Sequence, residues 1–324
     1  MQLHHSRIFA ALAATCLAAS AAACGSTEGS GTASTGSDGK LDVAVSFYPI
    51  QWLVEHIGGD DVTITSVTPA NVEPHDFELS PAEIAKLDKA DALIYVKGFQ
   101  SSLDEAAEAL QGPQIYDLSP AVDLVHHEGL GPDVHYEKDD NGNVTSHTHD
   151  EEPDALDPHF WLDPTRMSKA ADEVTKRLSE ADPDSAETYK ANAEQLKKKL
   201  SELDSSYSSG LKTCERRDMV TTHTAFGYLA DRYKLTQVAL SGLDPEAEPS
   251  PAVLSQVKKF IQDNGTTTIF SEALISPKVA ENLASETGIK TDVLDPLESQ
   301  PEGEDYLGAM DKNLTALRGA LDCS

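Results

Sequence analysis

LDVAVSFYPIQWLVEHIGGDDVTITSVTP, residues 41–69, contains the structural unit that this chain repeats. Its two ends, LDVAVSF and DVTITSVTP, are short runs rich in β-branched residues, as is typical of strands. A helical pattern separates them, and a strand, a helix and a second strand in this order indicate a parallel βα unit.

The alternation of strand-like runs and helical patterns continues to the end of the chain. The first set is completed by DALIYVK (91–97) and PQIYDLS (113–119). A second set consists of MVTTHT (219–224), TQVALSG (236–242), TTTIFSEA (266–273) and TDVLDP (291–296). We therefore predict an α/β protein with two Rossmann-like lobes, each a mostly parallel four-stranded sheet with flanking helices.

A cap residue followed by proline marks several predicted helix starts. The pairs are Ser80-Pro81, Asp163-Pro164, Ser250-Pro251 and Ser276-Pro277. Ser80 and Glu83 have the spacing of a capping box.

One long helix is predicted between the two sets of strands. In PDSAETYKANAEQLKKKLSELDSSYSSGL (183–211) apolar residues recur at alternating spacings of three and four. This pattern predicts an amphipathic helix of about 25 residues, roughly 38 Å long. Such a helix would act as a strut and keep lobe motion small; the alternative is that it packs on one lobe only.

The N-terminal residues are typical of an export signal. A basic start around Arg7 precedes a small and apolar run, Ile8 to Ala23, that is too short to span a membrane comfortably. Cys24 follows where a lipoprotein signal peptidase would cut; the alternative is a plain secretory signal cleaved nearby. Residues 25–39 are rich in Ser, Thr and Gly and predict a flexible tether.

These features predict five segments. Residues 1–23 are a signal peptide, 24–40 a tether, 41–181 the N-terminal lobe, 182–211 the linking helix and 212–324 the C-terminal lobe. We expect the folded part to lie outside the cytoplasm, held at the outer face of the cell membrane by a lipid on Cys24.

Charge and cysteine content restrict the partners. With 25 Lys+Arg and 55 Asp+Glu, the net charge of −30 disfavours nucleic acid and attracts cations, although an acidic balance also serves solubility. Cys16 lies in the leader, so Cys214 and Cys323 are left in the folded part. In an oxidising compartment we predict that they form a disulfide; two unpaired thiols are the alternative.

Residues 126–158, HHEGLGPDVHYEKDDNGNVTSHTHDEEPDALDP, are polar and lack a period, which predicts a long exposed loop. Its histidines are His126, His127, His135, His147 and His149. Histidine-rich tracts bind metal weakly, so these residues form a candidate secondary site. The alternative is a charged insert without a role.

The other histidines outside the leader are placed differently. His75 follows the second predicted strand, His223 ends the fifth and Asp295 ends the eighth. Ligands gather beyond the carboxyl ends of parallel strands, and His159, just before a helix start, can reach the same place. His56 lies within the first predicted helix, where we expect a structural role.

Three imidazoles and one carboxylate are a donor set that tetrahedral Zn²⁺ prefers, at about 2.0–2.1 Å, whereas Mn²⁺ and Mg²⁺ prefer more oxygen. We predict His75, His159, His223 and Asp295 as the ligands, with Asp76 and Glu272 as candidates to orient the rings. Because the histidines must be deprotonated, affinity should fall below pH ~6.

Five motifs stand out beside the long helix: FYPIQWLVEHIGGD (47–60), EPHDFELSP (73–81), DPHFWLDP (157–164), HTAFGYLADRY (223–233) and LDPL (294–297). Together they resemble the cluster A-I family of metal-binding receptors for zinc and manganese ABC importers, of the high-affinity zinc uptake type. The resemblance covers the chain from about Leu41 and implies the same four ligands. It also implies docking on a membrane permease driven by a cytoplasmic ATPase. Gln100 stands where some zinc-type members have an acid, so a water or another acid could replace Asp295.

We therefore predict a monomeric solute-binding lipoprotein that captures Zn²⁺ between its lobes, delivers it to an ABC permease and catalyses nothing. A manganese receptor of the same type is the first alternative. A zinc hydrolase would need a base, for which Glu272 is the candidate, and the sequence has no H-E-x-x-H. An adhesion or metal-buffering lipoprotein without a transporter is the third.

Overall fold

The structure, a computed structural model, describes residues 39–127, 134–138, 144–148 and 156–324. All of them belong to one compact unit, Ala33–Ser324. The predicted signal peptide, almost all of the tether, the lipidation residue Cys24 and the loop residue His149 lie outside the described residues.

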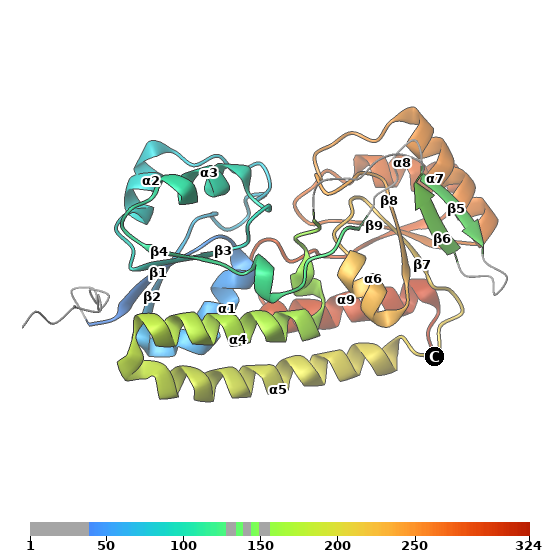
Figure 1. Cartoon of the computed structure of the whole chain (residues 1–324). Coiled ribbons are helices and arrows are strands. Elements are labelled where there is room, and N and C mark those ends of the chain that lie inside the picture. Colours follow the sequence, from blue (N-terminus) through green and yellow to red (C-terminus); the bar gives the residue numbers. More distant parts are fainter. Residues whose placement is uncertain (1–38, 128–133, 139–143, 149–155) are drawn as a thin grey trace, which may run out of the picture. The chain divides into compact units, whose positions relative to one another are not determined.

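Two four-stranded parallel sheets form the framework (Figure 1). The first has the order β2-β1-β3-β4, with β1 (Leu41–Val45), β2 (Val62–Ser66), β3 (Ala92–Tyr95) and β4 (Gln114–Asp117). The second has the order β10-β9-β7-β8, with β7 (Asp218–Thr221), β8 (Thr236–Ala239), β9 (Thr268–Ser271) and β10 (Lys290–Val293). Every predicted strand is present, and the predicted fold class is confirmed.

The sheets are flanked by helices, several of which begin at the predicted caps. They are α1 (Tyr48–Gly58), α2 (Pro81–Leu87), α3 (Ser101–Ala109), α4 (Pro164–Ala181), α6 (Gly227–Tyr233), α7 (Pro251–Asn264), α8 (Lys278–Thr287) and α9 (Tyr306–Leu321). The side chains of Ser80, Asp163 and Ser250 accept the expected backbone hydrogen bonds, and Ser80 forms its capping box with Glu83. The cap at Ser276 is wrong, because α8 begins at Lys278 and its cap position is Pro277, which has no side-chain acceptor.

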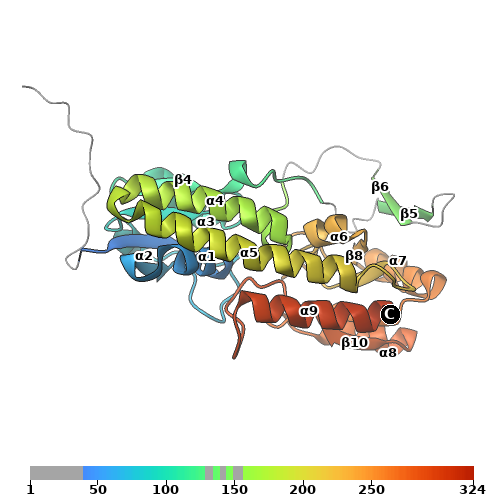
Figure 2. The same cartoon turned by 90° about the horizontal axis from the view of Figure 1, so that it is seen from below.

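The predicted long helix is α5 (Ala186–Gly210), and it has 25 residues. Its buried face carries Tyr189, Leu200 and Tyr207, and it packs against α1, α4 and α9 (Figure 2). One hydrophobic cluster runs through these helices and includes side chains of both sheets, such as Val43 and Met219. The helix therefore packs against helices of both halves of the molecule, and the alternative that it packs on one lobe only is wrong. Small lobe motion and the predicted lobe bounds remain predictions.

The long loop contains regular structure that we did not expect. Strands β5 (Val134–Lys138) and β6 (Val144–Thr148) pair antiparallel, with His135 opposite His147. Asn141-Gly142 between them is a hairpin signal in the sequence, but the two strands are too short and polar to show an apolar period.

The predicted disulfide is confirmed. Cys214 and Cys323 are bonded, which joins the segment before β7 to the end of α9, and Ser324 N donates to Thr213 O at 2.9 Å beside it. Two unpaired thiols are therefore excluded.

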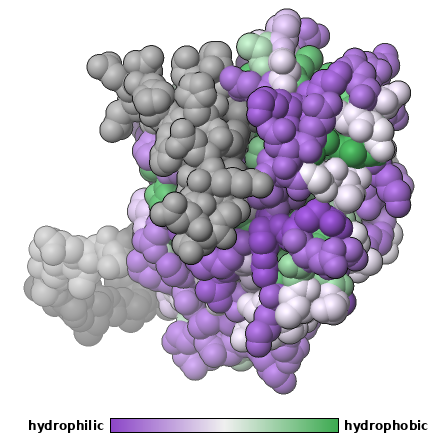
Figure 3. Space-filling model, turned by 90° about the vertical axis from the view of Figure 1, so that its right-hand side faces the viewer, coloured by the Kyte–Doolittle hydropathy of each residue, from purple (hydrophilic) through white to green (hydrophobic). Residues whose placement is uncertain are grey.

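Among the described residues, none of the helices has the length and apolar character needed to span a bilayer. The face seen in Figure 3 is largely hydrophilic, with scattered apolar residues.

Candidate metal centre

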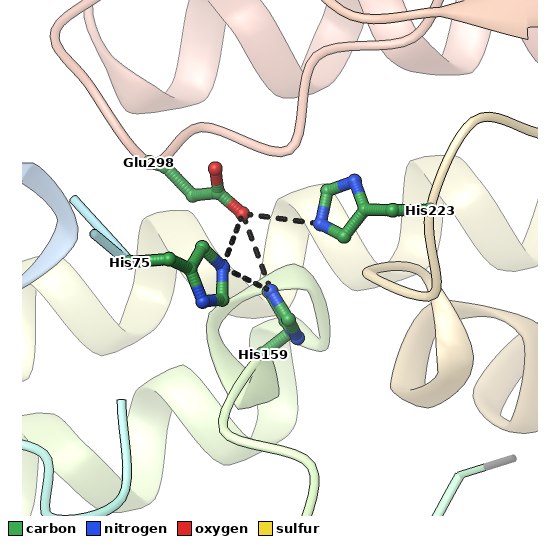
Figure 4. A group of neighbouring side chains, drawn as sticks. All are labelled: His75, His159, His223 and Glu298. Carbon is green, nitrogen blue, oxygen red and sulfur yellow. Dashed lines mark hydrogen bonds and ion pairs between the residues drawn. The ribbon is translucent and has the colours of Figure 1, made fainter. Parts of the chain in front are cut away.

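Four side chains from four separate segments converge on one point (Figure 4). His75 lies in the connection after β2, His159 at the start of the short 3-10 helix η3 (Phe160–Leu162), His223 just after β7 and Glu298 after β10. One ligand atom from each residue lies within 4.8 Å of the others. The structure thus brings the three predicted histidines together with Glu298, an acid that is not among the predicted ligands.

Four of the six distances between these atoms are close to those between the ligands of a tetrahedral zinc ion. Donors about 2.0–2.1 Å from a tetrahedral ion lie about 3.3–3.4 Å apart. The Nε2 atoms of His75 and His159 are 3.2 Å apart. Glu298 Oε1 lies 3.5 Å from His75 Nε2, 3.2 Å from His159 Nε2 and 3.4 Å from His223 Nε2.

Burial also supports a cation at this point. His159 and His223 are fully buried and Glu298 is 4% exposed. His223 Nε2 and Glu298 Oε1 face each other at 3.4 Å, an ion pair only when the ring is protonated. Buried charged groups are paired or bind a metal, so a cation shared by these atoms fits their burial. Three borderline-soft nitrogens and one carboxylate suit Zn²⁺.

His75 is positioned by its neighbours in the connection that follows β2. Its backbone N–H donates to Glu73 Oε1 at 3.0 Å, and its ring meets that of Phe99 edge-on with centroids 4.5 Å apart. Gln100 is buried and donates to Pro74 O at 3.0 Å and Thr68 Oγ1 at 2.8 Å. Gln100 therefore holds the segment that carries His75.

His159 is oriented by Asp157. Asp157 Oδ1 accepts from the His159 backbone N–H at 2.9 Å and from its Nδ1 at 2.7 Å. This leaves Nε2 facing the centre, as in carboxylate–histidine–zinc arrangements. Next in the chain, Trp161 Nε1 donates to Pro296 O at 2.7 Å and ties this segment to the turn that carries Glu298.

His223 is paired with Glu272, one of the two acids expected to orient a ring. Glu272 Oε2 lies 2.7 Å from His223 Nδ1, and the Thr222 hydroxyl donates to the other oxygen. Asp76 does not have the corresponding place: its backbone N–H donates to Glu73 Oε2 at 3.2 Å. Among the described residues, no contact joins its carboxylate to any of the three rings.

Asp295, the predicted fourth ligand, lies outside the group of four. Its Oδ1 accepts from Leu297 N at 2.8 Å, and Asn313 bonds both its backbone N–H and its carbonyl, at 2.9 and 2.7 Å. Leu297 has a left-handed backbone with φ 60°. Asp295 thus forms the turn that directs Glu298 into the centre. Asp-Pro directly after a strand signals such a turn, and Glu298 is the next acid beyond it.

The carboxylates decide the protonation of the centre. Burial lowers the pKa of His223, but Glu272 and Glu298 outweigh it and raise the pKa to about 10. Burial likewise lowers the pKa of His159, but Asp157 and Glu298 leave it raised. For Glu298, burial raises the pKa, yet the three imidazoles hold it well below its usual range. Without metal, the rings of His159 and His223 therefore hold protons that a metal ion must displace.

Among the loop histidines, the structure describes the side chains of His126 and His127, and neither belongs to the group of four. His126 is exposed, and both ring nitrogens of His127 contact carboxylates: Nδ1 lies 2.6 Å from Asp157 Oδ2 and Nε2 lies 3.1 Å from Asp231 Oδ2. His135 and His147 are paired in the hairpin, and their side chains are not among the described features. The secondary metal site remains a prediction. His56 Nδ1 donates to Trp52 O at 2.9 Å within α1, which fits its expected structural role.

A cavity of about 750 Å³ adjoins the centre on the side of the second sheet. Glu272 and Glu298 lie in its wall and are buried, whereas Asp292 and Glu302 are exposed. It is rich in acids and contains one lysine, Lys312, which pairs with Glu304 at 2.5 Å. A cation in this cavity would meet a negative potential.

Comparison with known proteins agrees with the geometry. A family model described as the periplasmic zinc-uptake complex component A matches residues 43–320. The high-affinity zinc uptake system protein ZnuA of Bacillus subtilis is 36% identical over 308 residues, covering 93% of each chain. The zinc-binding protein AdcA of Streptococcus pyogenes is 35% identical over 292 residues, 88% of this chain but 57% of that protein. The chain thus spans little more than half the length of such streptococcal relatives.

Solved structures share the fold. The zinc-bound ZnuA-like domain of Streptococcus pneumoniae AdcA matches with a TM-score of 0.71 and 33% identity over 88% of this chain and all of that one. The laminin-binding protein Lmb of Streptococcus agalactiae, described as an adhesin with metal-transporting activity, matches with a TM-score of 0.74 and 29% identity over 87% and 99% of the two chains.

Proposed function

This chain belongs to the family of periplasmic zinc-uptake A components, and on that premise we propose that it captures one Zn²⁺ and delivers it to an ABC permease. His75, His159, His223 and Glu298 would be the ligands. The observation that carries the proposal is their spacing: the four donors come from distant segments and all lie within 4.8 Å of one another, and Glu298 Oε1 is 3.2–3.5 Å from each of the three Nε2 atoms.

Zinc is favoured over manganese by the donor set. Three imidazole nitrogens surround one carboxylate oxygen, whereas a manganese site would have more oxygen ligands. Asp157 and Glu272 accept contacts at the Nδ1 atoms of two of the rings, so the Nε2 atoms are left to bind the ion.

Binding, rather than catalysis, is the role that fits this arrangement. A zinc hydrolase keeps one coordination position open for water and places a base beside it. Here Glu298 occupies the fourth corner. Glu272, the candidate base, contacts His223 at Nδ1, on the opposite side of the ring from the centre.

The N-terminal residues and the family support the proposed location. Residues 1–23 would direct export, and a lipid on Cys24 would hold the protein at the outer face of the cell membrane through the tether 24–40. The names of relatives, periplasmic in one case and lipoprotein in another, support this location. The partners would be a membrane permease and its cytoplasmic ATPase, served by a monomeric receptor with two lobes, 41–181 and 212–324.

Metal analysis of the purified chain tests the proposal. After loading with equal zinc and manganese and removal of free metal, the wild type should retain one zinc per chain. His223→Ala should retain far less, whereas His56→Ala, a matched histidine outside the centre, should behave as the wild type. Equal zinc in the wild type and His223→Ala, or preferential retention of manganese, would contradict the proposal.

A further inference from the structure

A row of four side chains leads from the metal centre to the protein surface. His159 Nδ1 contacts Asp157 Oδ1 at 2.7 Å, Asp157 Oδ2 contacts His127 Nδ1 at 2.6 Å, and His127 Nε2 contacts Asp231 Oδ2 at 3.1 Å. Exposure rises along the row: the side chains of His159 and Asp157 are 0% exposed, His127 is 13% exposed and Asp231 is 71% exposed.

Both carboxylate oxygens of Asp157 are occupied, from opposite sides. Oδ1 accepts from the backbone N–H and Nδ1 of His159, and Oδ2 faces His127 alone. Leaving a buried carboxylate oxygen without a hydrogen-bond donor costs free energy, which favours rotation of the carboxylate toward another donor. Contact with His127 therefore keeps the plane of the carboxylate in the orientation that His159 requires.

The His127 ring packs closely against helix α6. At Gly227, an added Cβ would lie 2.3 Å from His127 Cγ, so only glycine leaves room for the imidazole. The ring of Tyr228 meets it perpendicularly at 4.5 Å between centroids, and the Tyr228 hydroxyl donates to Asp157 O at 2.6 Å. Asp231, one turn further along, holds the far nitrogen. Three residues of one short helix thus contact the His127 side chain and fix its position.

We propose that His127 is a positioning residue of the metal centre, which acts through Asp157 to fix the orientation of His159. The inference rests on the proposed zinc-binding function and removes His127 from the candidate secondary ligands, because both of its nitrogens serve this row. It also gives His127 a structural role at the start of segment 126–158. The two ends of this segment meet beside His159, because Asp157 N donates to Val125 O at 2.8 Å.

The test measures zinc release from the full chain to an excess of chelator, together with the absorption spectrum of the Co²⁺-substituted protein. Loss of an outer partner of a ligand weakens metal binding about 10–100-fold. His127→Ala should release zinc faster by a factor in this range and shift the Co²⁺ bands. Gly227→Ala should do the same, because it displaces the imidazole without removing it.

Two variants separate positioning from general damage. In His127→Asn, the side-chain amide can donate to Asp157 from the place of Nδ1, so release should return close to the wild-type rate. Gly319→Ala is the matched glycine control, since its Cβ would meet nothing within 4 Å, and it should release zinc as the wild type does.

Wild-type release and an unchanged Co²⁺ spectrum in His127→Ala and Gly227→Ala would overturn the proposal. So would His127→Asn that is as impaired as His127→Ala. A wild-type chain that binds no zinc would instead overturn the proposed function.

Discussion

At the scale of single residues, Asp295 and Glu298 have different roles, and this difference determines which acid completes the donor set of the centre. Asp295 shapes a turn with its oxygen on Leu297 N, and Glu298 presents Oε1 to three imidazoles. The two acids are three residues apart in sequence, but only Glu298 lies in the group of four.

Conservative amide variants distinguish these roles. Asp295→Asn keeps an acceptor for Leu297 N, so its zinc affinity should stay within a few-fold of the wild type. Glu298→Gln removes the anionic ligand and should weaken binding at least about 100-fold, since losing a direct ligand should cost more than losing an outer partner. Competition against a chromogenic chelator measures both. A larger loss in Asp295→Asn than in Glu298→Gln would restore Asp295 as the ligand.

Protonation of the metal-free centre predicts a pH dependence. The pKa of His223 is raised to about 10, because Glu272 and Glu298 outweigh the effect of burial. At pH 7 the ring therefore holds a proton that zinc must displace, and the apparent affinity should rise with pH through neutrality.

Calorimetry in buffers of different ionisation enthalpy should show proton release on zinc binding at pH 7. Glu272→Gln removes one acid that raises the His223 pKa, so it should release fewer protons. An observed enthalpy that is the same in every buffer would contradict this protonation scheme.

Three residues of the centre could be predicted from the sequence, because His75 and His223 follow strands and His159 precedes a marked helix start. Glu298 was missed, because the Asp-Pro signal indicates a turn but not the left-handed Leu297 that directs Glu298 into the centre, a conformation that local preferences disfavour. The roles of Asp157 and His127 were also missed: both lie in the polar segment 126–158, whose composition gives no sign of burial.

At the scale of elements, prediction succeeded where a local signal agreed with the final packing. β-branched runs gave all eight strands of the two main sheets, and Ser80, Asp163 and Ser250 gave helix starts. It failed at β5 and β6, where five-residue polar strands have no apolar face.

The Cys214–Cys323 bridge closes 109 residues of chain and should stabilise the fold. The chain-entropy estimate for a loop of about 100 residues is about 4.7 kcal/mol, and disulfides typically contribute about 2–4 kcal/mol. Cys214→Ser/Cys323→Ser should lower the free energy of unfolding by about 2–5 kcal/mol in denaturant titrations. Zinc affinity should be unchanged, because the bridge precedes β7 whereas His223 follows its other end. Wild-type stability of the double variant under oxidising conditions would contradict the prediction.

At the scale of the whole molecule, charge should speed the capture of zinc. The chain carries a net charge of −30, and acids line the cavity beside Glu298. The association rate should fall several-fold as ionic strength rises from about 0.01 to 0.15 M, where the screening length shortens from about 30 to 8 Å.

Stopped-flow mixing with zinc measures this rate. Asp292→Asn/Glu302→Gln in the cavity wall should slow association and reduce its salt dependence. The matched pair Glu187→Gln/Glu194→Gln, on the exposed face of α5, should have little effect. Equal rates in the two double variants would show that the cavity does not guide the ion.

Anomalous diffraction at the zinc edge, from crystals of the zinc-loaded chain, tests the proposed centre most directly. One strong peak is expected about 2.0–2.1 Å from the Nε2 atoms of His75, His159 and His223 and from a Glu298 oxygen. A zinc ion bound elsewhere, with these three imidazoles left uncoordinated, would contradict it.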